Sequence, residues 1–428
     1  MPPTTDNARS PPPGDRVDPP GFAAALRFWL LLGWISFGGP AGQIAIMHAE
    51  LVERRRWIDA QRFADGLGVC MLLPGPEAQQ LATWLGWTLH GVRGGIAAGV
   101  LFVLPSALLL LALSAIYVTW GAVPGVGGAI EGLKVAVLVL LAAAVVRLAR
   151  RFLHGAVHVA LALGAGIAIA LGAPFPAILG VAAISGWLAS RGQPLVPPTS
   201  PPTAARSARA CHATALLLLA AWLVPIALVV ATAGAGSTLA QVSLFFSRAA
   251  LVTFGGAYAV LPYVSQHAVA SGWLQPEQML VGLGLAETTP GPLIIVLEFV
   301  GFLAGWQRPD AMGPAATAAL GAALTVWATF VPSLMLVFAV APHAQRVARS
   351  SVLRGALAGI TAAVVGVVAE LGMVFARGTL LPHDAMRWPL LGLLVALALL
   401  AWRVRLAVPV LVAVGAAGGV ALRLSGLA

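Results

Sequence analysis

Two short motifs, each present twice, are the parts of this chain best suited to bind a ligand. Gly38-Gly39-Pro40 follows Phe37, and its partial copy Gly255-Gly256 follows Phe254. Pro74-Gly75-Pro76 and Pro290-Gly291-Pro292 lie downstream of these. Glycine and proline both interrupt helices. Each interruption leaves unpaired N–H groups at the start of the next helix, where the helix dipole also attracts anions. The motifs therefore predict an anion site built largely from backbone.

The side chains beside these motifs are polar but mostly uncharged, and they can donate hydrogen bonds to a hydrated tetrahedral oxyanion. The alternative is that Ser, Thr and Gln merely bridge neighbouring helices. No catalytic or metal-binding residue is predicted. The predicted substrate-binding residues are Gly38, Gly39, Pro40, Gln43, Pro74, Gly75, Pro76, Gln79, Gly255, Gly256, Tyr258, Thr288, Thr289, Pro290, Gly291 and Pro292.

Four charged residues lie inside apolar stretches near the motifs. Arg27 and Arg248 precede the two Phe-Gly-Gly sequences and fall on one helix face when the halves are overlaid, so we predict that they attract the anion. Arg27 could instead extend its side chain to the membrane interface. Glu77 and Glu287 lie within three residues of a Pro-Gly-Pro. A carboxylate repels an anion when ionised and tolerates it when protonated, so these two residues are predicted to couple protons to transport. Glu77 could instead stabilise its helix N-terminus.

Composition identifies the class of protein. Of 428 residues, 59% are hydrophobic and only 9% are charged, too few to cover a soluble fold of this size. Continuous apolar runs of about 20 residues predict an all-α polytopic membrane protein and not a barrel. The net charge of +10 comes from arginines in short loops, which indicates the positive-inside bias and not nucleic-acid binding. Two cysteines and the absence of a catalytic constellation predict no cofactor and no enzyme activity.

The two halves of the chain are copies. The Phe-Gly-Gly motifs are 217 positions apart, and both Trp57/Trp273 and the Pro-Gly-Pro motifs are 216 apart. Seven segments separate the starts of the copies, so the repeats are predicted to have opposite orientations in the membrane. Thirteen segments are predicted: 22–47, 63–89, 95–118, 130–152, 155–172, 174–190, 213–234, 240–265, 277–305, 314–341, 354–376, 388–402 and 404–424.

The predicted organisation is a disordered Pro-rich tail (1–20), a first repeat (21–190), a cytoplasmic Pro/Arg linker (191–212), a connecting transmembrane segment (213–234) and a second repeat (235–428). Arginine asymmetry predicts a cytoplasmic N-terminus and a periplasmic C-terminus. Arg54-Arg55-Arg56 fits only if segments 22–47 and 63–89 are broken helices that enter and return on one side. Ordinary kinks are the alternative.

The stretches FGGPAGQIAIMHAELVERRRWIDAQRF and LLPGPEAQQLATWLGWTLHG of the first half, with TFGGAYAVLPYV and LAETTPGPLIIVLEFVGF of the second, resemble the chromate ion transporter family, in its long two-domain bacterial form. The resemblance implies gradient-driven efflux of chromate across the inner membrane, chromate resistance, and sulfate as a competitor. The implied partners are chromate, sulfate and membrane lipid, with a homo-oligomer possible.

Other functions stay open at this point. A transporter of sulfate or another oxyanion without a resistance role is the nearest alternative, and a membrane-embedded enzyme or receptor-like subunit is a more distant one. The copies also differ at two places. Ala257 stands where the first repeat has Pro40, and Leu293 stands where it has Glu77, so the predicted site is not symmetric.

Overall fold

The structure is a computed structural model that describes residues 20–121, 123–191, 208–344, 347, 350–382, 385–404 and 406–426. Every regular element in these ranges is helical, which confirms the predicted all-helical fold. Most of the predicted tail and linker lies outside the described residues, and so do Arg206, Arg346, Arg349 and Arg405.

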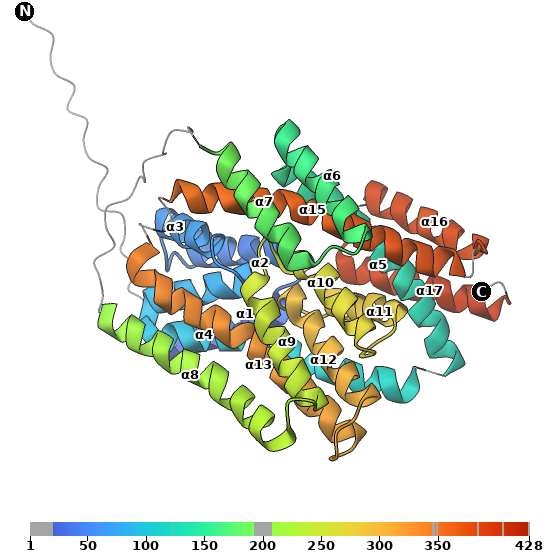
Figure 1. Cartoon of the computed structure of the whole chain (residues 1–428), viewed down its shortest axis with the longest axis horizontal. Helices are drawn as coiled ribbons and strands as arrows, with labels where there is room; N and C mark the ends of the chain where they lie inside the picture. Colours follow the sequence, from blue (N-terminus) through green and yellow to red (C-terminus); the bar gives the residue numbers. More distant parts are fainter. Residues whose placement is uncertain are drawn as a thin grey trace, which may run out of the picture.

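The helices follow the predicted apolar segments (Figure 1). The first half contains α1 (Phe22–Ile35), α2 (Gly39–His48), the π-helix η1 (Ala49–Arg54), α3 (Ala60–Cys70), α4 (Glu77–Trp120), α5 (Pro124–Phe152), α6 (Ala156–Ala170) and α7 (Phe175–Ala189). The helix α8 (Ala208–Ala233) connects the halves. The second half contains α9 (Thr238–Val252), α10 (Ala257–Ala270), α11 (Pro276–Thr288), η2 (Leu293–Ile295), α12 (Val296–Gln307), α13 (Pro314–Val340), η3 (Ala341–His343), α15 (Ser351–Leu380), α16 (Trp388–Val404) and α17 (Val408–Leu424).

All four motifs interrupt helices, as their sequences predict. The two Phe-Gly-Gly breaks separate α1 from α2 and α9 from α10, and the two Pro-Gly-Pro breaks separate α3 from α4 and α11 from η2. The glycines of the breaks have positive φ angles, for example 90° at Gly38 and 121° at Gly75. Residues with a Cβ atom rarely adopt a positive φ angle, which explains why glycine stands at each break.

Each broken helix pair folds back toward its starting point. In the first repeat, the Trp57 ring after α2 lies 5.4 Å from the Phe28 ring in α1. The corresponding rings of the second repeat, Trp273 and Phe245, lie 5.6 Å apart. The first half of α4 ends at a kink at His90, whose Nε2 lies 2.7 Å from the Pro20 carbonyl oxygen before α1. The two repeats therefore share one fold.

The breaks of one repeat are held by the other repeat. The Gly75 N–H donates to the Thr253 carbonyl, and the Gly291 N–H donates to the Ser36 carbonyl, each over 2.8 Å. Gly75 corresponds to Gly291 and Ser36 to Thr253 under the repeat spacing. Such an exchange of identical contacts is what a two-fold axis generates. The breaks therefore meet at the centre of the two repeats.

The long helices make a second exchanged contact. Gly132 of α5 lies against the backbone of Gly415 in α17, and Gly359 of α15 lies against the backbone of Gly186 in α7. Small residues allow membrane helices to approach closely and pack. The last helix of the first repeat, α7, thus packs on α15 of the second repeat, and the last helix of the second repeat, α17, packs on α5 of the first.

The molecule has two ends, which we name by their contacts. At the linker end, His154, Ser190 and Arg354 surround one pocket, and the His212 and His343 rings lie 5.4 Å apart. At the far end, the Thr238 N–H donates to Asp310 over 2.9 Å. The 26 residues of α8 connect the two ends and span about 39 Å.

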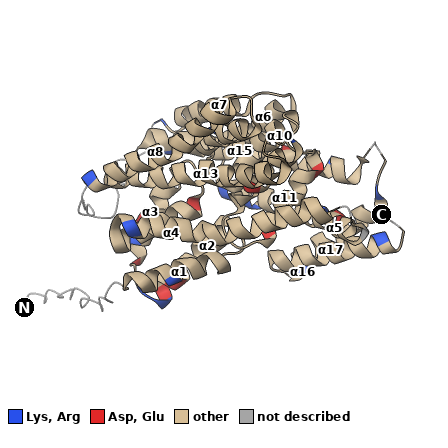
Figure 2. Cartoon of the chain, turned by 90° about the horizontal axis from the view of Figure 1, so that it is seen from below, with Lys and Arg blue, Asp and Glu red and all other residues tan. Residues whose placement is uncertain are grey.

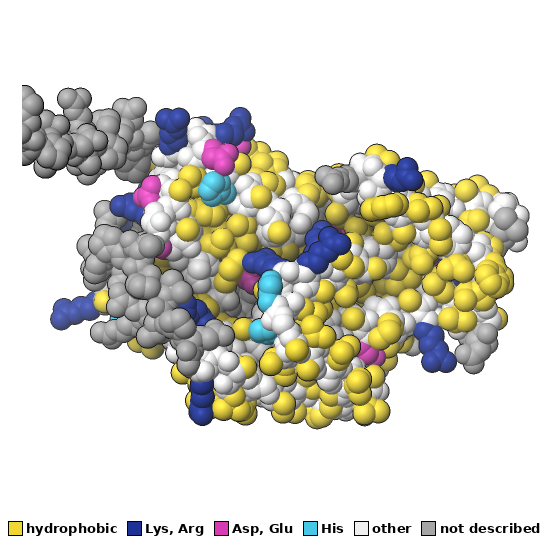
Figure 3. All heavy atoms as spheres, turned by 90° about the horizontal axis from the view of Figure 1, so that it is seen from above, with side chains coloured by type: hydrophobic (Ala, Val, Ile, Leu, Met, Phe, Trp, Pro, Cys, Tyr) yellow, Lys and Arg dark blue, Asp and Glu magenta, His cyan; other side chains and the backbone are white. Residues whose placement is uncertain are grey.

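The surface is that of a multi-pass membrane protein. Five helices are long and apolar enough to cross a membrane: α4, α5, α8, α13 and α15. Large apolar side chains face outward from other helices as well, for example Leu163, which is 64% exposed. Charged residues are sparse along the helices (Figure 2). On the face shown in Figure 3, basic, acidic and histidine side chains gather at a hollow in an otherwise largely hydrophobic surface.

Candidate functional site

A cavity of about 270 Å³ lies where the two Phe-Gly-Gly breaks meet. Its wall is formed by the breaks of both repeats and by the last turns of α5, which belongs to the first repeat. The lining residues are Gly38, Gly39, Pro40, Ala41, Glu77, Leu140, Ala144, Arg147, Leu148, Arg151, Phe152, Gly255, Gly256, Ala257, Tyr258, Glu287 and Val408.

The breaks supply a two-fold related part of the wall. The four residues from Gly38 to Ala41 correspond one to one with the four from Gly255 to Tyr258. The helices α2 and α10 begin here, and the first N–H groups of a helix have no partner within it. A Cβ atom placed on Gly38, Gly39 or Gly256 would meet nothing within 4 Å. An oxyanion therefore has space to approach the backbone at the N-termini of both helices.

Charged side chains form another part of the cavity wall, and this part does not follow the two-fold relation between the repeats. The Tyr258 hydroxyl donates a hydrogen bond to the Glu287 carboxylate. Arg147 interacts electrostatically with Glu287, and Arg151 interacts electrostatically with Glu77. Two guanidiniums thus face two carboxylates around one cavity. An incoming anion competes with the carboxylates for the arginines, and protonating a carboxylate would remove that competition.

The predicted residues of the Pro-Gly-Pro breaks lie outside the cavity wall. A Cβ atom on Gly75 would lie 3.0 Å from the Ser333 hydroxyl oxygen, and one on Gly291 would lie 2.5 Å from that of Ser106. The hydroxyl groups beside the second break bond to carbonyls of their own helix. The residues concerned are Pro74, Gly75, Pro76, Thr288, Thr289, Pro290, Gly291 and Pro292. Their contacts are those of a tightly packed junction between the repeats.

Four other predicted residues also lie outside the wall. Gln43 is buried, and its side-chain amide donates to the Gly291 carbonyl, so it ties a Phe-Gly-Gly helix to the opposite Pro-Gly-Pro break. Gln79 is fully buried, and neither polar atom of its amide has a hydrogen-bond partner among the described residues. Arg27 and Arg248 are exposed on α1 and α9.

Sequence reasoning missed the two arginines that do line the cavity. Sequence analysis attributes the positive charge to arginines in short loops and gives Arg147 and Arg151 no role in binding. The structure places them in the last turns of α5, on the side that faces both glutamates. Their spacing of four residues on an apolar helix was the available signal, because it puts both on one helix face.

Comparison with known proteins agrees with this architecture. The chromate transporter family matches residues 23–187 and 240–420. The chain belongs to the chromate transporter family. The two matched regions of this transporter run from α1 to α7 and from α9 to α17, with α8 between them. The duplication inferred from the motifs is therefore also seen in the family match.

Three relatives of the transporter span most of its length. A chromate transport protein of Pseudomonas aeruginosa is 32% identical, with 88% of this chain and 85% of the relative covered. A probable chromate transport protein of Synechococcus elongatus is 28% identical, with 92% and 94% covered. A chromate transport protein of Cupriavidus metallidurans is 27% identical, with 82% of both covered. No solved structure matches the transporter significantly.

Proposed function

We propose that this transporter exports chromate from the cytoplasm across the inner membrane and thereby confers chromate resistance. The observation that carries the proposal is the central cavity, where the N-termini of α2 and α10 and the guanidiniums of Arg147 and Arg151 surround one small space. Helix N-termini and arginines both bind oxyanions, and arginine geometry suits tetrahedral ones. The names of the relatives point to chromate as that anion.

The cavity is closer to the linker end, because Arg151 and Phe152 belong to the last turn of α5, next to His154. The arginines of this end support a cytoplasmic assignment. The exchanged contacts support a two-fold relation between the repeats, and α8, which carries the chain from the linker end to the far end before the second repeat begins, supports an axis in the membrane plane. In such transporters, rocking of one repeat against the other opens a central site to each side in turn.

Two driving forces fit the site. Export of a dianion from a negatively charged cytoplasm is favourable, because the membrane potential contributes about 2.3 kcal/mol per charge for each 100 mV. Glu77 and Glu287 line the same cavity, and protonating either one would free an arginine for the anion, so proton binding and anion binding would favour each other. That linkage would couple proton movement to anion movement through these two glutamates. Exchange against a second anion is the competing source of energy.

Sulfate is the competing substrate, because backbone N–H groups and guanidiniums recognise the tetrahedral dianion shape that sulfate shares with chromate. The decisive measurement is uptake of labelled chromate into inverted membrane vesicles, with and without excess sulfate. We expect energised uptake that the double variant Arg147→Gln/Arg151→Gln abolishes and that sulfate reduces only partly. Uptake of labelled sulfate that exceeds chromate uptake would favour a sulfate transporter. No energised uptake of either ion would overturn the proposal.

A further inference from the structure

A line of buried hydroxyl groups runs along α13 from the first Pro-Gly-Pro break to the far end. Thr317, Thr325, Thr329 and Ser333 recur at multiples of four residues, and each is at most 2% exposed. Residues four apart lie close to each other around a helix, so Thr325, Thr329 and Ser333 follow one another, and the 16 positions from Thr317 to Ser333 cover about 24 Å. At one end, the Ser333 hydroxyl faces Gly75. At the other, the Asp310 N–H donates to Thr317 Oγ1 over 3.1 Å.

Half of these hydroxyls have unmet hydrogen-bonding capacity. Thr317 and Thr325 each donate over 2.8 Å to a carbonyl of their own helix, as hydroxyls in membrane helices commonly do. The hydroxyl oxygens of Thr329 and Ser333 have no hydrogen-bond partner among the described residues. Buried polar groups of this kind are normally satisfied by ordered water. The stretch nearest the break is therefore suited to hold water molecules.

An acidic residue adjoins the same stretch. Glu298 of α12 is 3% exposed, and within the described chain its Oε2 has no hydrogen-bond partner. Gly305 of α12 lies against Thr317, and Gly301 lies against Thr325, so the two helices pack antiparallel. The same register places Glu298, three residues before Gly301, at the level of Thr325 and Thr329.

No charged side chain in the described part of the chain acts on the Glu298 carboxyl. The elements that pack on α12 carry several ionisable groups, and none of them is a counter-ion for it: Glu77, His90, Arg93 and Tyr117 on α4, Arg248 on α9, Tyr258, Tyr263 and His267 on α10, and Glu277 and Glu287 on α11. Acidic residues inside membrane segments are rare, and they mark ion pathways and proton relays.

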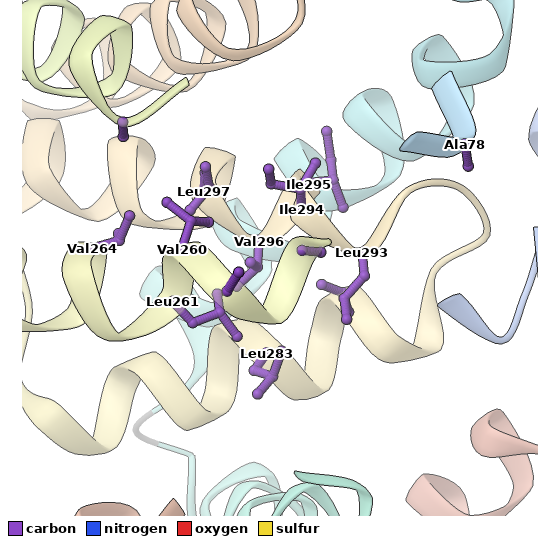
Figure 4. Close-up of a cluster of buried hydrophobic side chains, with 14 of the residues drawn as sticks. Ala78, Val260, Leu261, Val264, Leu283, Leu293, Ile294, Ile295, Val296 and Leu297 are labelled. Atoms are coloured by element: carbon purple, nitrogen blue, oxygen red, sulfur yellow. The ribbon is translucent and has the colours of Figure 1, made fainter. Parts of the chain in front are cut away.

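The corresponding positions of the first repeat are apolar. Under the spacing of 227 that pairs Ser106 with Ser333, Thr325 and Thr329 correspond to Ala98 and Phe102, and under the Pro-Gly-Pro spacing of 216 Glu298 corresponds to Ala82. The residues just before Glu298 also belong to a buried apolar cluster, with Leu293 to Leu297 packed near Val260 and Leu261 (Figure 4). An unpaired acid and free hydroxyls in only one copy of the repeat are not explained by the shared fold.

We propose that Glu298, Thr329 and Ser333 form a proton path from the far end to the central cavity. This inference rests on the proposed function and adds a route for its proton. A hydronium ion from the far end transfers its proton to a carboxylate oxygen of Glu298. The carboxyl then releases the proton to water held by Thr329 and Ser333. The path ends at Gly75, two residues before Glu77 in the cavity wall.

The test uses the purified full-length transporter in liposomes that contain a pH-sensitive dye. Chromate added on one side should produce proton flux in the wild type. Glu298→Gln should lower that flux at least tenfold and leave chromate–chromate exchange within twofold, because exchange moves no net proton. Glu370→Gln on α15 is the matched control, since this half-buried glutamate lies away from the path, and it should retain both activities.

A second variant keeps the inference testable if Glu298→Gln inserts poorly. Thr329→Val removes one hydroxyl at nearly constant volume and should lower proton flux at least threefold with exchange retained. Unchanged proton flux in whichever variant inserts would overturn the path, and so would wild-type chromate transport without any proton flux. A wild type that transports no chromate in either mode would instead refute the proposed function.

Discussion

At the residue scale, the motif glycines fall into two groups with different surroundings. Gly38 and Gly256 border open space, whereas a Cβ atom on Gly75 or Gly291 would press against Ser333 or Ser106. Alanine at any of the four requires a left-handed conformation, which costs about 1–2 kcal/mol. Overpacking adds about 1–3 kcal/mol at Gly75 and Gly291 alone. We expect Gly38→Ala and Gly256→Ala to reach the membrane and transport weakly, and Gly75→Ala and Gly291→Ala to lose thermal stability in detergent. Equal melting temperatures for all four would contradict this division.

A second prediction at this scale concerns the arginines of α5. Removing one guanidinium that faces a divalent anion should cost about 1.5–3 kcal/mol, the range for hydrogen bonds to charged groups. Arg151→Gln should therefore raise the KM for chromate roughly 10-fold to 100-fold, since about 1.4 kcal/mol is a factor of ten. Arg150→Gln is the control, because Arg150 is the neighbouring residue but does not line the cavity. Equal KM values for the two variants would remove Arg151 from the site.

The residue-scale predictions from sequence succeeded where backbone chemistry decided the outcome. Glycine and proline interrupt a helix through their own covalent structure, so the breaks at Gly38 and Gly75 followed directly. Side-chain roles depended on which elements meet. Gln79 and Arg151 both lie in predicted spans, yet only Arg151 reaches the cavity, because α5 ends beside it. No local pattern contains that information.

At the element scale, the close crossing of α7 with α15 gives a test of how the repeats are joined. Gly186 of α7 lies against the Gly355 and Gly359 backbone, whereas Gly180 of the same helix has no neighbour within 4 Å of a Cβ position. Gly186→Leu should separate the helices and lower the melting temperature in detergent, with an overpacking cost of about 1–3 kcal/mol or more. Gly180→Leu should leave it unchanged, because its side chain would point to lipid. A matched loss in both variants would show that the crossing is not responsible, since leucine is a better helix former than glycine and propensity alone would stabilise both.

Element positions were largely predictable, and element partners were not. Apolar runs and the repeat spacing gave the helices within a few residues. The spacing also implied that any contact between repeats would occur twice. It could not indicate that the Gly75 N–H bonds to Thr253, because hydrophobic periodicity describes one helix and not its neighbour. The packing of α7 on the second repeat and of α17 on the first is likewise a property of the assembled fold.

At the scale of the whole molecule, the proposed inverted arrangement predicts that equivalent positions face opposite sides of the membrane. Arg55 and Ser271 correspond under the repeat spacing, and each precedes the tryptophan that packs back onto its broken helix. In a background without Cys70 and Cys211, Arg55→Cys should react with an impermeant reagent from the cytoplasm, and Ser271→Cys should react from the periplasm. A reporter fused after Ala428 should give a periplasmic signal.

The pair of cysteines is the sharper test, because each alternative gives its own labelling pattern. If segment 22–47 crosses the membrane as a plain kinked helix, Arg55→Cys would react from the periplasm. If the repeats are parallel, both cysteines would react from the same side. The structure argues against both alternatives. The Trp57 ring returns to Phe28 in α1, which does not fit a plain crossing. The helix α8 runs from the linker end to the far end before α9 begins, which does not fit parallel repeats. Opposite labelling would also fit alternating access, since two inverted copies of one fold can exchange conformations and so open the same central cavity to either side.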